Sequence, residues 1–244
     1  MNEPVVLRAL AKLTLSLRIT GIRPDGYHLI DAEMVTIDLH DVVTIAPGDG
    51  LIVKGRYAAG IPTDDRNLVR RALRAIGRTA TVTVDKAIPA GAGLGGGSAD
   101  AAAVLRWADC RDTAIAAAIG ADVPFALQGG RALVHGIGDE IDPLPFLDQT
   151  FTLVTPPLAI ATVDAYRAWD ALGGPVGQGA NDLEPAALAA EPQLAAWRDR
   201  IGDACGFVPV LAGSGSTWFV AGAHPDLAGR FPDAMVAVTR TDRP

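Results

Sequence analysis

The chain of 244 residues is poor in cysteine and in positive charge. Its two cysteines, Cys110 and Cys205, are too few for a disulfide framework and lack the paired spacing of a zinc or iron–sulfur site. We therefore expect a reducing compartment, the cytoplasm. The 21 basic and 28 acidic residues leave a net charge of −7. This balance argues against a protein that coats nucleic acid or anionic lipid.

Long uncharged runs are also rare. Residues 4–20 are partly apolar, but Arg8, Lys12 and Arg18 interrupt them, so they do not form a secretion signal. The longest uncharged run lies between Asp203 and Asp226, and a proline and a glycine–serine stretch break it. This run predicts two short strands around a loop and not a membrane span.

Apolar material, by contrast, is abundant: 49% hydrophobic and 20% charged residues exclude intrinsic disorder. The length corresponds to one large or two small lobes. Two prolines between residues 142 and 148 mark a candidate boundary, so we expect lobes at 1–148 and 149–244. Either a monomer or a homodimer is compatible with the sequence.

The hydrophobic periodicity predicts a mixture of strands and helices. Alternating apolar residues from Leu13 to Ile19 indicate a half-buried strand with Lys12, Thr14 and Ser16 on one polar face. Further strands are expected at 34–39, 42–45, 79–85, 151–154, 158–163, 208–211 and 218–220, and helices at 67–76, 99–107, 113–119 and 185–200, with Ser98 as an N-cap.

A glycine-rich segment, residues 89–98, lies between an expected strand and an expected helix. Glycines let backbone N–H groups converge on a phosphate, and the helix N-terminus adds partial positive charge. The segment lacks the Gly-Lys-Ser/Thr of a Walker loop and the glycine spacing of a dinucleotide fold. It predicts a phosphate loop of another kind, with a turn used only for packing as the alternative.

A second glycine-rich segment, residues 212–217, lies between two expected strands. It is either a tight hairpin or the opposite wall of a cleft that binds phosphates from both sides.

Three charged residues near these segments are candidates for the chemistry. Lys12 and Lys86 could supply positive potential to a polyanion, or they could be ordinary solvated lysines. Asp122 is expected in a loop before Pro124. It could act as a base or a metal ligand, or it could cap the next segment.

Six segments together resemble the GHMP kinases, the superfamily of galactokinase, homoserine, mevalonate and phosphomevalonate kinases. They are Ala11-Lys12-Leu13, Arg23-Pro24-Asp25-Gly26-Tyr27-His28, residues 91–98, Gly120-Ala121-Asp122-Val123-Pro124, Asn181-Asp182-Leu183-Glu184 and Gly213-Ser214-Gly215. They are most similar to the branch that phosphorylates the 2-hydroxyl of a cytidine-diphosphate-linked methylerythritol in the non-mevalonate isoprenoid pathway. The resemblance implies an α+β, two-lobed fold with an N-terminal ribosomal-protein-S5-like lobe, a C-terminal ferredoxin-like lobe and the active site in the cleft.

The resemblance also implies roles for individual residues of an ATP-dependent small-molecule kinase. Asp122 would accept the hydroxyl proton, and Lys12 would orient that carboxylate. Mg²⁺ would bridge the β- and γ-phosphates near Ser98, with its other ligands undetermined. The residues implied at the ATP site are Asn67, Lys86, Pro89, Ala90, Gly91, Ala92, Gly93, Leu94, Gly95, Gly96, Gly97 and Ser98. Those implied at the second substrate are Thr14, Tyr27, His28, Thr162, Tyr166, Gly213, Ser214 and Gly215, with Tyr27 stacked on the cytosine, Tyr166 a candidate for its other face, and His28 hydrogen-bonded to it.

The chain departs from the family pattern in places. Thr14 stands where the family usually has asparagine, and Ser98-Ala99-Asp100 replaces the usual Ser-Ser-Asn. Segments 107–120 and 173–179 are also short. Two alternatives therefore stay open: a sister kinase for mevalonate-type or homoserine substrates, or a nucleotide-binding regulator that has lost catalysis. The presence of both Lys12 and Asp122 argues against the regulator.

Overall fold

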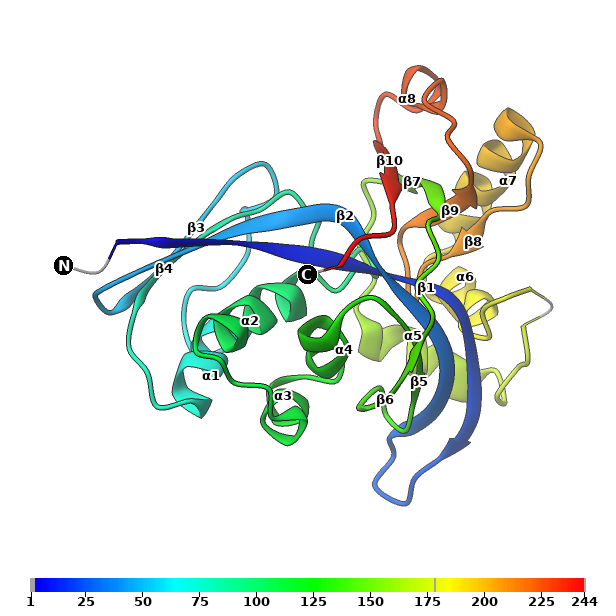
Figure 1. Cartoon of the computed structure of the whole chain (residues 1–244). Helices are drawn as coiled ribbons and strands as arrows, with labels where there is room; N and C mark the ends of the chain where they lie inside the picture. Colours follow the sequence, from blue (N-terminus) through cyan, green and yellow to red (C-terminus); the bar gives the residue numbers. More distant parts are fainter. Residues whose placement is uncertain (1–2, 178, 244) are drawn as a thin grey trace.

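A long hairpin runs across the molecule (Figure 1). In the computed structural model, which describes residues 3–177 and 179–243, β1 (Val5–Ile22) pairs antiparallel with β2 (His28–Ala46). The strand expected around Leu13 is part of β1, and the two expected at 34–39 and 42–45 are one continuous strand. The pairing shifts register between Leu10 and Lys12 and again between Thr14 and Ser16. Such irregularities re-aim side chains, and here they flank the lysine of interest.

The hairpin belongs to a six-stranded sheet. The other strands are β3 (Gly50–Lys54), β4 (Thr81–Asp85), β5 (Arg131–His135) and β6 (Glu140–Leu144). Their order is β3-β4-β2-β5-β6, with β1 on β2. Val82 and Val84 of β4 are buried, as the alternation predicted. The glycine segment therefore follows a strand inside this sheet.

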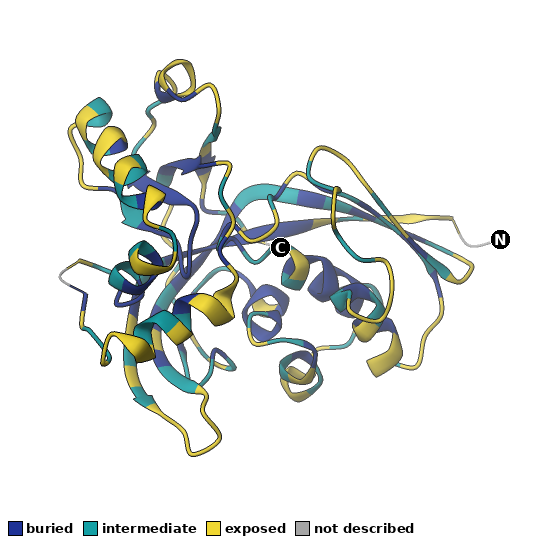
Figure 2. Cartoon of the chain, turned by 180° about the vertical axis from the view of Figure 1, so that it is seen from behind, coloured by how far each residue is buried: buried dark blue, intermediate teal, exposed yellow. Residues whose placement is uncertain are grey.

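Four helices pack on one face of this sheet (Figure 1). They are α1 (Leu68–Ala75), α2 (Gly96–Trp107), α3 (Thr113–Ile119) and α4 (Val123–Gln128). Three consecutive alanines of α2, 101–103, are fully buried, and their short side chains let the helix lie close to β1 and between α1 and α4. Figure 2 shows the same helices with buried inner and exposed outer faces. The close packing fixes the helix that begins at the glycine segment.

A second, antiparallel sheet is formed by the C-terminal part of the chain. Its strands are β7 (Thr150–Thr155), β8 (Val210–Leu211), β9 (Trp218–Ala221) and β10 (Met235–Arg240), with helices α5 (Thr162–Ala171), α6 (Glu184–Ala190), α7 (Gln193–Cys205) and α8 (Leu227–Arg230). The order β10-β7-β9-β8 is that of a ferredoxin-like sheet, which confirms the expected architecture. The uncharged run after Asp203 forms β8, a loop and β9. No helix in the described ranges is long and apolar enough to cross a bilayer.

The two sheets share a core. Leu13 and Val35 of the first sheet pack in one cluster with Leu153 and Phe219 of the second, and Thr241 bridges back to β2. The chain passes from one sheet to the other between β6 and β7. The boundary between lobes at 148 stays a prediction.

Several local predictions were wrong. Residues 158–163 do not form a strand: they follow Pro156 and Pro157 as an irregular segment and enter α5, because proline cannot donate to a sheet ladder. The helix expected at 185–200 is two helices, broken at Pro192. Ser98 is not the N-cap of α2: Gly95 is, in a left-handed conformation with φ +67°. Strands β3, β5, β6 and β10 and helices α4, α5 and α8 had not been predicted.

Candidate active site

A cleft of about 690 Å³ contains most of the predicted site residues. Those that line it are Lys12, Asn67, Lys86, the whole segment 89–98, Asp122, Thr162, Tyr166, Gly213 and Ser214. Thr14, Tyr27, His28 and Gly215 do not line it. Thr14 and Gly215 are buried and do not reach the cleft surface. Tyr27 and His28 lie at the turn that joins β1 to β2. The structure thus brings the residues predicted for the ATP site into one cleft, and only some of those predicted for the second substrate.

The two glycine segments lie in direct contact. Gly91, Gly93 and Gly95 all have positive φ, which L side chains rarely adopt. A Cβ on Gly93 would overlap the carbonyl oxygen of Ala212. The amide of Thr217 donates to the carbonyl oxygen of Ala92 at 3.3 Å. These contacts bring segment 212–217 against the glycine-rich segment 89–98, so the two segments lie on the same side of the cleft.

Lys12 and Asp122 form the polar pair at the centre of the cleft. Their Nζ and Oδ2 atoms are 3.7 Å apart, and the side chains are 9% and 34% exposed. Asp122 immediately precedes α4 but makes no side-chain capping bond, so its carboxylate is not used to start the helix. The Lys12 ammonium donates to the Thr14 hydroxyl at 3.0 Å, and the Lys12 amide donates to the carbonyl oxygen of Leu94. Lys12 therefore ties β1 to the phosphate loop.

Lys86 is buried between two carboxylates. Its ammonium donates to Asp41 of β2 and, at 2.7 Å, to Oδ2 of Asp100 in α2. Burial raises the pKa of Asp100 to about 7, against the opposing charge of Lys86. Burial also disfavours the ammonium, but Asp100 and Asp41 outweigh this effect and raise the pKa of Lys86. Lys86 is not a solvated lysine, and its charge is already matched by protein carboxylates. Its place at the ATP site stays a prediction.

Asn67 and Ser98 stand at the rim of the phosphate loop. The Asn67 side chain caps α1: its oxygen accepts from the Val69 amide at 2.9 Å, and its nitrogen donates to the Pro62 carbonyl oxygen. Ser98 lies in the first turn of α2. No cluster of three or more His, Cys, Asp or Glu side chains suited to a metal occurs among the described residues. Mg²⁺ usually keeps several waters and binds through phosphates with few protein ligands, so a lone hydroxyl fits it.

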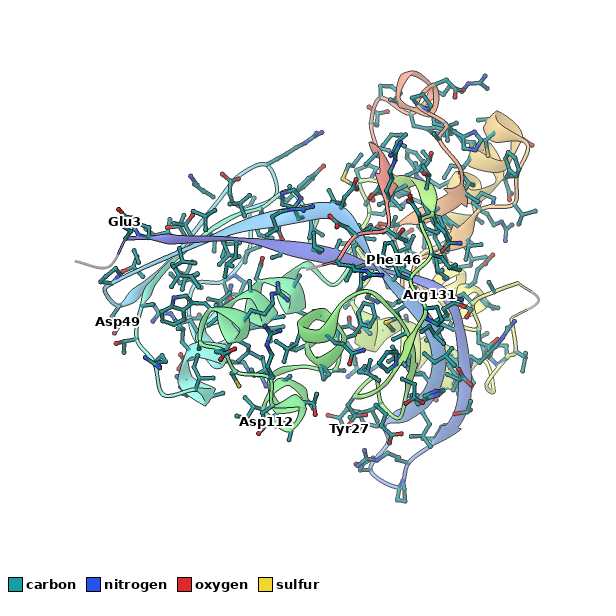
Figure 3. All side chains as sticks on the ribbon, in the orientation of Figure 1. Glu3, Tyr27, Asp49, Asp112, Arg131 and Phe146 are labelled. Carbon is teal, nitrogen blue, oxygen red and sulfur yellow. The ribbon has the colours of Figure 1, made fainter. Side chains whose placement is uncertain are left out.

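The opposite end of the cleft is made of aromatic side chains. Tyr166 of α5 lines the cleft, and burial together with the nearby charge of Asp122 raises its pKa to about 12. The His28 ring lies 4.7 Å from the Tyr166 ring, and its Nε2 is 2.8 Å from Asp170. Tyr27 is 58% exposed near the tip of the β1–β2 hairpin (Figure 3). The structure joins His28 to Tyr166 but does not bring Tyr27 to the cleft wall.

The second glycine segment is held by Asn181. Its side-chain nitrogen donates to the carbonyl oxygens of Leu211 and Gly213 at 2.8 and 2.7 Å. The Ser214 hydroxyl lies 3.1 Å from that of Thr162. This explains why an asparagine stands at the start of the Asn-Asp-Leu-Glu segment: its amide bonds to two backbone carbonyls from a distant part of the chain.

Two groups near the site were missed from the sequence. Asp41 is completely buried, and Asp170 contacts His28. An acidic residue directly before the apolar run Val42–Val43 of β2 was a usable signal for Asp41, because buried carboxylates need partners. Asp170 carries no such signal, since it lies on the exposed face of a helix.

Known proteins resemble this chain along most of its length. The GHMP kinases N terminal domain matches residues 67–130. The 4-diphosphocytidyl-2-C-methyl-D-erythritol kinase of Paracoccus denitrificans is 39% identical over 86% of this chain and 84% of its own length. That of Mesorhizobium japonicum is 37% identical over 95% and 94%. A crystal structure of 4-(cytidine 5'-diphospho)-2C-methyl-D-erythritol kinase has a TM-score of 0.75 at 30% identity, with 98% of this chain and 100% of that chain covered.

These similarities confirm the resemblance drawn from the motifs and the two-lobed α+β fold. They favour the cytidylyl-substrate branch over the sister kinases, because the identity to that branch extends over both sheets. The chain belongs to the 4-diphosphocytidyl-2-C-methyl-D-erythritol kinase family, a branch of the ATP-dependent GHMP small-molecule kinases.

Proposed function

We propose that this protein transfers the γ-phosphoryl group of ATP to the 2-hydroxyl of 4-diphosphocytidyl-2-C-methyl-D-erythritol, in the non-mevalonate route to isoprenoid precursors. The observation that carries the proposal is the Lys12–Asp122 pair, which lines the same cleft as the phosphate loop. The names of the relatives supply the identity of the acceptor.

Asp122 accepts the proton of the substrate hydroxyl while that oxygen bonds to the γ-phosphorus. The bond from this phosphorus to the β–γ bridging oxygen breaks, and ADP leaves. Lys12, 3.7 Å from Asp122, orients the carboxylate and offsets negative charge on the transferring group. A carboxylate beside an ammonium is a weak base, but phosphoryl transfer has a loose transition state that depends mainly on positioning and charge neutralisation.

The backbone amides of residues 90–97 and the N-terminus of α2 hold the phosphates. Asn67 and Lys86 border the adenine end. Mg²⁺ bound with ATP supplies charge neutralisation on the β- and γ-phosphates, and the Ser98 hydroxyl is the protein ligand we assign to it. Most of the positive potential comes from main-chain groups, which suits a chain with a net charge of −7.

For the cytidine end, we assign Tyr166 to a face of the base and His28 to a hydrogen bond with it. Tyr27 would reach the base only from the exposed hairpin tip. Thr14, Thr162, Gly213, Ser214 and Gly215 complete the proposed acceptor side. Thr14 acts through Lys12, to which it is hydrogen-bonded, because its own side chain is buried.

The cleft is complete within one chain, so a monomer can carry the activity and a homodimer would carry two independent sites. We assign the protein to the cytoplasm, where its two free cysteines stay reduced. The regulator alternative is disfavoured because a protein that only binds nucleotide gains nothing from holding Asp122 beside Lys12.

The direct test is a phosphoryl-transfer assay. Purified full chain is incubated with ATP, MgCl₂ and the cytidylyl-methylerythritol, and ADP release and the phosphorylated product are measured. Mevalonate and homoserine serve as alternative acceptors, and CDP serves as a competitor. We expect turnover with the cytidylyl substrate alone, inhibited by CDP. No ADP release above background would refute the proposal.

A further inference from the structure

The phosphate loop begins and ends on the same buried group of charges. Asp41, Lys86 and Asp100 are 0%, 4% and 5% exposed, and they come from β2, the end of β4 and α2. Asp41 lies 45 residues before Lys86, and Asp100 lies 14 residues after it. The intervening loop contains five glycines, whose backbone is the least restricted of all residues. A loop of this composition needs its ends fixed if its amides are to be preorganised.

Asp41 fixes the chain where it enters the loop. One of its oxygens accepts from the amides of Ala87 and Ile88 at 2.6 and 2.9 Å, and the other accepts from the Lys86 ammonium. Three bonds from one buried carboxylate leave residues 86–88 no freedom to rotate. The entry to the loop is therefore tied to the sheet.

Lys86 then crosses to the far end of the loop. Its ammonium reaches Oδ2 of Asp100, one turn into α2, at 2.7 Å. A Cβ on Gly96 would lie 3.2 Å from this ammonium and 3.0 Å from the Ile88 side chain. Glycine at the first position of the helix lets α2 approach Lys86 this closely without displacing either side chain.

We propose that Asp41, Lys86 and Asp100 form a loop clamp that holds the phosphate loop in its anion-binding conformation, so that Lys86 and Asp100 are positioning residues for ATP. This inference rests on the proposed function only in taking the loop's ligand to be ATP. It gives a structural role to the place at the ATP site that the resemblance implies for Lys86: the ammonium supports the loop and does not itself bind the nucleotide. The Lys86 ammonium already has two carboxylate partners, Asp41 and Asp100. Its role is to connect the two ends of the loop.

Asp100→Ala separates these two roles. Without Asp100, Lys86 and Asp41 remain as a balanced buried pair, so the fold keeps no unmatched charge. The hydrogen bond from Lys86 to α2 is lost. We therefore expect the Kd for ATP to rise about tenfold, the size expected for one lost charged hydrogen bond. If Lys86 instead contacted ATP directly, releasing it from Asp100 would leave the affinity unchanged or improve it.

The experiment measures Kd for Mg²⁺-ATP and for inorganic tripolyphosphate by titration calorimetry on the full chain, with no acceptor present. Asp100→Ala is expected to weaken both ligands by the same factor, because the loop binds phosphates and not the base. Asp100→Asn keeps an acceptor for Lys86 and is expected to stay within about twofold of wild type. Asp85→Ala, which removes an exposed carboxylate next to Lys86 in sequence, is the matched control and should leave Kd unchanged.

Thermal melts distinguish positioning from simple stabilisation. A lowered Tm in Asp100→Ala with an unchanged Kd for both ligands would overturn the clamp, as would equal losses in Asp100→Ala and Asp100→Asn. A loss for ATP but not for tripolyphosphate would also overturn it, since the effect would then lie at the base. Because no acceptor is used, failure of the transfer assay with intact ATP binding would refute the proposed substrate and leave the clamp result standing.

Discussion

The two ends of the cleft are built from different parts of the polypeptide. At the proposed phosphate end, the groups that we assign to the ligand are backbone amides of a glycine loop, supported by the buried charges of the loop clamp. At the proposed acceptor end they are side chains: Tyr166, which lines the cleft, and His28 beside it, supported by the partly exposed Asp170. A phosphate chain offers only acceptor oxygens, so backbone N–H groups are sufficient to bind it. Recognition of a particular base needs side chains with chosen donors and acceptors.

The difference also concerns charge. The loop clamp brings one ammonium and two carboxylates, so it adds no net positive charge at the phosphate end. In our proposal, attraction for phosphate there comes from loop amides, the α2 N-terminus and Lys12. The proposed catalytic pair, Lys12 and Asp122, lines the same cleft. Changes at one end should therefore alter KM for one substrate only, and changes in the middle should alter kcat.

The largest effect is expected in the middle of the cleft, from Asp122→Asn. Removal of the base should lower kcat about a thousandfold, within the range of general-base catalysis. The Kd for ATP should stay the same, because the amides that hold phosphate are untouched. Steady-state kinetics and an ATP titration give the two numbers. Asp226→Asn, which changes an exposed carboxylate directly before α8, is the control. If Asp122→Asn turns over like wild type, Asp122 is not the base.

The next effect tests the main-chain nature of the phosphate end. In Gly93→Ala the new Cβ meets the Ala212 carbonyl oxygen and separates the two glycine segments. We expect the Kd for ATP to rise at least about tenfold, beyond the roughly 1 kcal/mol of stability that an alanine at positive φ costs. Gly77→Ala is the matched control, since it has φ +60° and no atom within 4 Å of its Cβ. Equal affinities in the two variants would show that the contact between segments is irrelevant to ATP.

The contrast between the ends also explains how much the sequence could predict. The strand–loop–helix order and the residues Lys12 and Asp122 depend on local patterns, and the structure brings them into one cleft. The loop clamp depends on the pairing of β2 with β4, in which Val42 lies opposite Asp85, and no local pattern encodes that register. The same holds for Asp170, whose partner His28 lies 142 residues away. Residues 158–163 were misassigned because their apolar run has the composition of a strand. Pro156 and Pro157, which directly precede the run, were a local signal against a strand.

A smaller effect is expected at the acceptor end, from Asp170→Asn. The carboxylate fixes which His28 nitrogen carries the proton, because Nε2 must donate to it and Nδ1 is left as an acceptor. Loss of this orientation should raise KM for the cytidylyl substrate about threefold, the worth of one partly exposed hydrogen bond. KM for ATP should not change. Asp164→Asn, on the same helix but paired with Arg167, is the control. An equal rise in both KM values would show that the two ends are not independent.

The smallest effect concerns stability and separates the buried charges of the phosphate end from the exposed ones elsewhere. Burial raises the pKa of Asp100 to about 7 from 3.8, so the folded state holds the proton more tightly than the unfolded state. Stability contributed by the protonated carboxyl is therefore present at low pH, is lost as pH rises from about 4 to 7, and changes little above 7.

The side chain in Asp100→Asn is neutral at every pH, so this variant lacks the loss. Its Tm, compared with that of wild type by calorimetry, should gain roughly 5 °C or more between pH 5 and pH 8. Asp226→Asn should differ from wild type by the same amount at both values. A Tm difference between Asp100→Asn and wild type that is independent of pH would mean that Asp100 is ionised in the fold throughout, and that the clamp holds two carboxylates on one ammonium without a proton.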